Sequence, residues 1–194
     1  MHRLKEEVMW CKKLRRTLAF ASVAMLMLAP VSCRDGELTT NLTVDDEAAI
    51  YAAVTRQLAT VDDTFGGNLK PPTLYVIRNT DDKAGNPGGQ QSKSALISHT
   101  VQSRIVAALA DLPTEVIWID KFGDAEFEDI PGSMVKNRGA IITLGNVYRQ
   151  ADGSVYVAGS IYIADTGAGG TTYILEKTGG VWVITGSTGV SWIR

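Results

Sequence analysis

A four-residue spacing of apolar side chains marks the first structured element of the chain. Ile50, Val54 and Leu58 recur at this spacing, which places them on one face of an α-helix. Thr43 has a hydroxyl suited to cap the first turn, and three acidic residues follow it, where carboxylates favour the positive end of a helix. The sequence therefore predicts an amphipathic helix over residues 44–60.

A second helix is predicted by the same spacing further along the chain. Val101, Ile105 and Leu109 form its apolar stripe, and Ser98 precedes them as a capping residue. We expect Pro113 to end this helix, because proline lacks the amide hydrogen that a helix interior needs.

Runs rich in β-branched and aromatic residues predict the strands. The first two, at residues 73–79 and 116–119, flank the second helix and form a possible βαβ or split unit. Between them lies an aperiodic loop over residues 80–93, whose length is typical of functional loops. Short glycine-containing connections separate the later strands, which are therefore expected to be antiparallel neighbours. These later strands span residues 140–148, 154–163, 171–177 and 181–185.

Alternation within the strand at residues 154–163 predicts two different faces. The aliphatic face comprises Val155, Val157, Ile161 and Ile163, and the opposite face carries Tyr156, Ala158, Ser160 and Tyr162. We expect the aliphatic face to contact the helices. The fold class that follows is α+β, with two N-terminal-half helices packed on a mostly antiparallel, curved sheet of about five to six strands.

The N-terminal segment has the profile of an export signal. Four basic residues at positions 12–16 precede an uncharged apolar run over residues 17–28, which is too short to span a bilayer. We predict a signal peptide over residues 1–32, a lipidated cysteine and polar tether over residues 33–43, and one domain over residues 44–194. Acidic residues near Met1 leave open that translation starts at Met9.

The residues Ala29-Pro30-Val31-Ser32-Cys33 resemble the lipobox of bacterial lipoproteins. The resemblance implies that Cys33 is acylated on sulfur and becomes the first residue of an exported, membrane-anchored protein that faces the periplasm or the cell exterior. Arg34, in place of an aspartate after the cysteine, favours the outer membrane by the same analogy. Ordinary signal-peptidase cleavage and an uncleaved anchor remain alternatives. The other cysteine, Cys11, lies within the signal, so the mature domain has no disulfide.

The order of helices followed by a glycine-punctuated antiparallel meander resembles the cystatin-like and nuclear-transport-factor-two-like α+β superfold. The local pattern that supports this is the last hairpin, which ends in Gly-Gly-Val181-Trp182-Val183-Ile184. The chain also resembles uncharacterised bacterial envelope proteins that share the run at residues 139–145 and a terminal Trp192-Ile193. Neither resemblance implies a particular activity.

Charge excludes one class of partner. Six of the 19 basic residues and two of the 21 acidic residues precede residue 34, so the remainder has a formal charge of about −6. No cluster of lysine and arginine occurs in that remainder, and a phosphate backbone would be repelled by it. We therefore expect no nucleic-acid partner.

Candidate catalytic and metal-binding groups are few. His99 is the sole histidine beyond the signal and is a weak candidate for a catalytic base, with Asp120 or Asp63 as its carboxylate partner. No pair of histidines or cysteines has metal-ligand spacing, so we predict neither a metal nor a cofactor. The acidic residues at positions 120–129 lack the order of a calcium loop and are interpreted as a solvated loop. The Gly-Ala-Gly-Gly run at residues 167–170 is interpreted as a turn.

Aromatic residues supply the candidate ligand-binding surface. Tyr156 and Tyr162, with Trp182 on a neighbouring strand, are expected on the sheet face opposite the helices, where they could line a cleft. The alternative is that a loop covers them. The favoured function is a lipid-anchored envelope module that binds a protein, a peptide or a small apolar ligand. The alternatives are a small enzyme that uses His99 and a structural protein whose sheet edge pairs with another copy.

Overall fold

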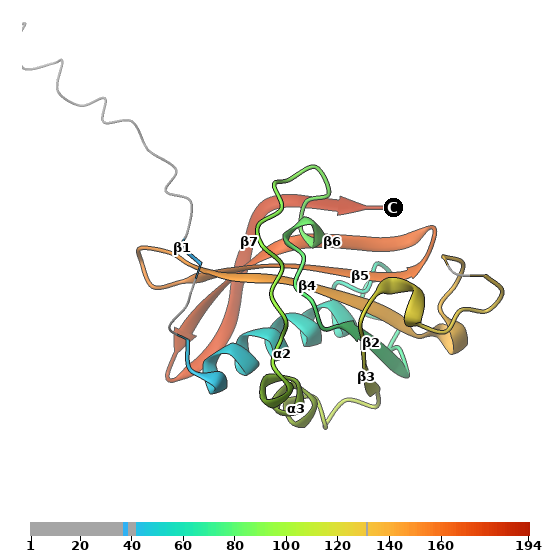
Figure 1. Cartoon of the computed structure of the whole chain (residues 1–194), viewed down its shortest axis with the longest axis horizontal. Coiled ribbons are helices and arrows are strands. Elements are labelled where there is room, and N and C mark those ends of the chain that lie inside the picture. The colour runs from blue at the N-terminus through green and yellow to red at the C-terminus, as the bar shows by residue number, and fades with distance from the viewer. Residues whose placement is uncertain (1–36, 39–41, 131) are drawn as a thin grey trace, which may run out of the picture. The chain divides into compact units, whose positions relative to one another are not determined.

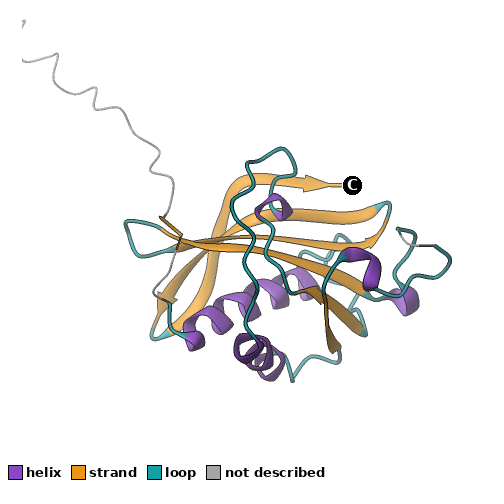
Figure 2. Ribbon diagram, in the orientation of Figure 1, coloured by secondary structure: helices purple, strands orange, loops and turns teal. Residues whose placement is uncertain are grey.

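The computed structural model describes residues 37–38, 42–130 and 132–194, and the predicted signal peptide and Cys33 lie outside them. A sheet forms the centre of the domain, with the strand order β3-β2-β4-β5-β6-β7, and β1 pairs with β4 off this path. The two α-helices of the described residues lie on one side of the sheet (Figures 1 and 2). The described helices are α2 (Val44–Thr60) and α3 (His99–Ala108). The described strands are β1 (Glu37–Leu38), β2 (Thr73–Ile77), β3 (Glu115–Ile119), β4 (Ala140–Arg149), β5 (Val155–Ala164), β6 (Gly167–Thr178) and β7 (Val181–Ile193).

The sheet is mixed but mostly antiparallel. β2 lies parallel to both β3 and β4, and the other strand pairs are antiparallel. The chain between β2 and β3 includes α3, so these elements form the βαβ unit that the sequence suggested. The predicted α+β fold class, with two helices on a mostly antiparallel sheet, is confirmed.

The helix α2 begins and ends where its sequence pattern predicted. The hydroxyl of Thr43 accepts a hydrogen bond from the amide of Asp46 at 3.0 Å, which satisfies one of the free amides of the first turn. Its apolar stripe is buried against the strands β4 and β5. Gly159 of β5 permits this close approach, because a Cβ atom there would lie 2.9 Å from Val54 Cγ1 and 3.1 Å from Leu58 Cδ1.

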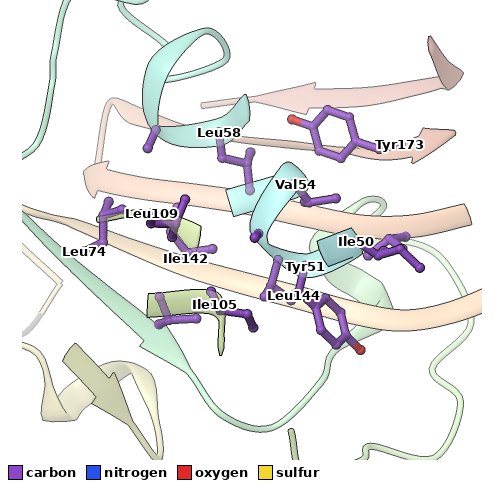
Figure 3. Close-up of a cluster of buried hydrophobic side chains, with 14 of the residues drawn as sticks. Ile50, Tyr51, Val54, Leu58, Leu74, Ile105, Leu109, Ile142, Leu144 and Tyr173 are labelled. Carbon is purple, nitrogen blue, oxygen red and sulfur yellow. The ribbon is translucent and has the colours of Figure 1, made fainter. Parts of the chain in front are cut away.

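Figure 3 shows the core that forms between the helices and the sheet. Ile50, Val54 and Leu58 of α2 meet side chains from α3, β2, β4 and β6 there, and all three are less than 2% exposed. The aliphatic face predicted for β5 joins the same cluster. Burial of this apolar surface, at roughly 25 cal/mol per Å², is the main stabilising term of the domain.

The loop over residues 80–93 covers the opposite face of the sheet. It contains a short 3-10 helix at Asp82–Ala84. The Asp82 carboxylate accepts hydrogen bonds from the Tyr148 hydroxyl at 2.7 Å, the Asn146 amide at 2.8 Å and the Ser92 hydroxyl. Burial opposes ionisation of Asp82, but these hydrogen bonds outweigh it and lower its pKa. The network ties the loop to β4.

The structure corrects the interpretation of residues 167–170. They are the first residues of β6, and the turn before them falls at Asp165 and Thr166. Gly170 lies under the loop, because a Cβ atom there would overlap the carbonyl oxygen of Ala84. Glycine in this run therefore permits close approach of a covering segment, which its sequence alone does not distinguish from a turn.

Two further segments differ from their predictions. β7 continues to Ile193, beyond the predicted end at residue 185, and pairs with β6 through two register shifts. Glu37 and Leu38, which the sequence placed in the tether, pair with Arg149 and Tyr148 of β4. Edge pairing of this kind depends on a distant strand, so the local sequence does not mark it.

The close contact at Gly170 generates a stability prediction. Replacing Gly170 with alanine should lower the free energy of unfolding by about 2 kcal/mol, because backbone rather than a flexible side chain occupies the space. Urea denaturation followed by circular dichroism would measure this. Gly186→Ala in β7 is the matched control, since its Cβ would meet nothing within 4 Å. Equal stability of the two variants would contradict the packing described here.

Candidate functional site: a groove between α2 and β7

An open groove runs between α2 and the last two strands. It consists of two hollows that share Gln57, Val61 and Ile184. We call the whole feature the α2–β7 groove. It lies where α2, which packs over β4 and β5, also contacts the outer strand β7. The buried stripe of the helix faces the sheet, and the groove is lined by Leu58 of that stripe and by residues from the other faces of the helix.

The first hollow lies at the C-terminal end of α2 and has a volume of about 570 Å³. Its lining is mixed, which suits a ligand with both apolar and hydrogen-bonding groups. The apolar part includes Leu58, Val61, Ile184 and Ile193, and the hydroxyl-bearing part includes Thr64, Thr171, Ser187 and Ser191. This volume falls within the usual range for small-ligand sites, roughly 300–1,000 Å³.

Asp62 is the carboxylate of this first hollow, and neighbouring side chains hold it in place. The hydroxyl of Tyr173 donates to Asp62 Oδ2 at 2.8 Å, and Gln57 Nε2 donates to the same oxygen at 3.2 Å. Burial, reinforced by Asp62, raises the pKa of Tyr173 far above its usual range, so the phenol stays protonated and remains a donor. Asp62 itself is exposed, which leaves its charge accessible to a ligand.

The second hollow, with a volume of about 940 Å³, lies beside the N-terminal half of α2. Asp46 organises its polar wall by accepting hydrogen bonds from Lys177 Nζ at 2.6 Å and Trp182 Nε1 at 2.8 Å. These two donors lower the pKa of Asp46 to about 2. The ammonium also lies 5.8 Å from the centre of the Trp182 ring, within cation–π range.

The charges of the groove favour binding of neutral or cationic groups. The two cations in its lining are already paired, Lys177 with Asp46 at 2.6 Å and Arg56 with Asp111 at 2.6 Å. Among the described residues, Asp62 is the lining carboxylate that forms no ion pair. An anionic ligand would therefore meet a negative charge without a free cation to offset it.

The structure does not bring His99 together with the carboxylates named for it. His99 is exposed at the first residue of α3. The carboxylate of Asp63 is buried and accepts hydrogen bonds from three backbone amides of the loop after α2. Asp120 forms an ion pair with Arg78 at 3.1 Å. Within the described part of the chain, no ion pair joins His99 to a carboxylate.

The expectation that Trp182 shares a face with Tyr156 and Tyr162 is wrong. β5 has β4 and β6 as neighbours, and β7 is a strand further out. Trp182 faces α2, through its hydrogen bond to Asp46, whereas both tyrosines face away from the helices.

Loops cover much of the tyrosine face. The hydroxyl of Tyr162 donates to the carbonyl of Ser133 at 3.0 Å, and its ring meets Phe122 edge-on with 4.8 Å between centroids. Tyr156 lies opposite Tyr148, which is bonded to the covering loop. Of the three aromatics named from the sequence, Trp182 is the one that lines the α2–β7 groove.

Acidic side chains of the loop after β3 form an ion pair and a hydrogen bond with nearby residues. Glu126 pairs with Lys136 at 2.9 Å, and Asp124 accepts the amide of Lys121 at 3.1 Å. The residues that the structure describes contain no group of three or more potential metal ligands. They also contain no helix long and apolar enough to cross a membrane.

Sequence reasoning missed Asp62, Gln57 and Tyr173 as site residues. Alternation along residues 171–177 does place Tyr173 on the same face as Leu175, toward the helices, so its orientation had a local signal. Its contact with Asp62 joins residues 111 positions apart, so no local pattern in the sequence predicts it. The packing of the chain after α2 beside β6 decides that contact.

The contacts of Asp46 generate a pH-dependent prediction. Because its pKa is lowered from 3.8 to about 2, the ionised form contributes stability at neutral pH that is lost as the pH falls toward 2. Asp46→Asn should therefore lower the free energy of unfolding by about 1 kcal/mol at pH 7, after allowance for solvent screening. The difference should shrink between pH 4 and about pH 2. Urea titrations at several pH values would test this, with the exposed Asp129→Asn as control; a difference independent of pH would refute it.

Comparison with protein-family models, with curated proteins and with solved structures finds no match to this chain.

Proposed function

We propose that this chain is a lipid-anchored protein of the bacterial cell envelope whose domain binds a partner in the α2–β7 groove. The observation that carries the anchoring is the run of residues that ends at Cys33. A basic segment, a short apolar stretch and small residues lead to this cysteine, in the order that export and acylation require. Acyl chains stabilise attachment by about 0.8 kcal/mol per buried methylene, so two or three chains hold a domain at a bilayer.

The observation that supports binding is the character of the groove. Its hydroxyls, its apolar side chains and the exposed carboxylate of Asp62, which forms no ion pair among the described residues, supply groups for recognition. Asp62 is held by Tyr173 and Gln57 before any ligand arrives, which reduces the entropy cost of binding. A role as an accessory or binding module fits these properties better than the alternative of acid-base catalysis by His99, which is exposed and forms no ion pair with a described carboxylate.

The partner proposed for the domain is an envelope protein, a peptide or a small apolar ligand. The formal charge of about −6 after residue 33 disfavours nucleic acid, since the sequence there has no cluster of lysine and arginine to offset phosphate repulsion. The membrane itself is a second partner, through the lipid on Cys33. In bacteria with two membranes, Arg34 after the cysteine favours the outer membrane.

Metabolic labelling with radioactive palmitate would test the anchor. The native chain should incorporate label and sediment with membranes, and Cys33→Ser should lose the label because the acylated sulfur is gone. Cys11→Ser is the matched control, since it removes the other cysteine of the chain and should leave labelling unchanged. Label that persists in Cys33→Ser, or a native chain without lipid, would overturn the proposed anchoring.

A further inference from the structure

The outer strand β7 lacks, in its first four residues, the features that protect sheet edges. It contains no charged residue and no proline, and the register shifts that bulge it occur after Ile184. Natural edges usually carry lysine, proline or bulges, because free backbone groups otherwise pair with another strand. Val181 and Val183 are 65% and 43% exposed. The stretch Val181–Ile184 is therefore open to strand addition.

The α2–β7 groove lies directly beside this stretch. All four residues line the second hollow, and the half-buried Trp182 and Ile184 alternate with the exposed valines. A strand added to β7 would place every second side chain over the outer surface of α2 and into the two hollows. Main-chain hydrogen bonds would then supply affinity, and the hollows would select side chains.

The charge of the domain and of Asp62 indicates which kind of polypeptide could bind beside β7. A second copy of this domain would bring a further charge of about −6 against the first, which costs free energy at close range. A polypeptide segment with a lysine or arginine would instead place a positive charge near Asp62. The groove and the edge together therefore favour an extended, cationic segment of another protein.

We propose that Val181–Ile184 of β7 and the α2–β7 groove bind an extended polypeptide segment with apolar and positively charged side chains, by strand addition. The proposal rests on the binding role proposed for the groove but is independent of the lipid anchor. It names the class of partner, and it assigns separate roles to the strand edge and to Asp62.

Fluorescence anisotropy with defined peptides would test this on the full chain purified in detergent. The probe is a nine-residue peptide of alternating valine and threonine with a lysine near each end, and saturable micromolar binding is expected. N-methylation of alternate amides should weaken binding about tenfold or more, a loss of about 1.4 kcal/mol, because pairing with β7 is blocked. Glutamate in place of the lysines should also weaken it. Equal binding of all three peptides, or none at millimolar concentration, would overturn the proposal.

Variants of the chain separate the edge from the rest of the surface. Val183→Lys should abolish peptide binding while the unfolding curve stays close to that of the native chain, since the side chain is exposed. Val190→Lys, in the later, bulged half of β7, is the matched control and should bind normally. Asp62→Asn should reduce the preference for lysine over glutamate. Native affinity in Val183→Lys would refute the assignment of the edge.

Analytical sedimentation tests whether a second copy of this chain, instead of a peptide, pairs with β7. A native chain that dimerises in detergent, and a Val183→Lys variant that does not, would identify a second copy on β7 and overturn the peptide proposal. A chain that incorporates palmitate but binds no peptide would overturn this inference and leave the anchoring intact. A chain that binds the peptide but carries no lipid would support this inference and overturn the proposed anchoring.

Discussion

The close contact between α2 and the middle of the sheet is the constraint on which the rest of the domain depends. Gly159 removes one side chain from β5, so Val54 and Leu58 lie directly on the strand. This fixes the helix over β4 and β5 and buries its apolar stripe (Figure 3). The same helix also contacts β7, the outer strand of the described sheet, and the groove lies between the two.

The other face of the sheet is closed by polar contacts and small residues. Asp82 accepts hydrogen bonds from Tyr148 and Asn146, and Gly170 leaves room for the backbone of the covering loop. The long loop that invited a functional interpretation thus has a structural role over the face it covers. The open hollow that contains the exposed Asp62 lies at the end of α2, on the helix side of the sheet.

The proposed function combines two features at different levels. The proposed acylation of Cys33 would supply an address through a single covalent modification, which requires no particular fold. In the same proposal, recognition belongs to the groove, which lies between α2 and the β7 residues that contact this helix. An extended cationic partner would satisfy the unpaired edge of β7 and the accessible charge of Asp62 together.

The sequence by itself determined the elements whose signals are local. Periodicity and the cap at Thr43 placed α2 at residues 44–60, and alternation assigned the two faces of β5, because side-chain spacing follows directly from helix and strand geometry. Only the tertiary structure decided that Gly170 belongs to a strand, that Trp182 faces α2 and that Asp62 meets Tyr173. Those outcomes depend on strand order, on register and on what covers each face, and residues far apart in the chain set all three.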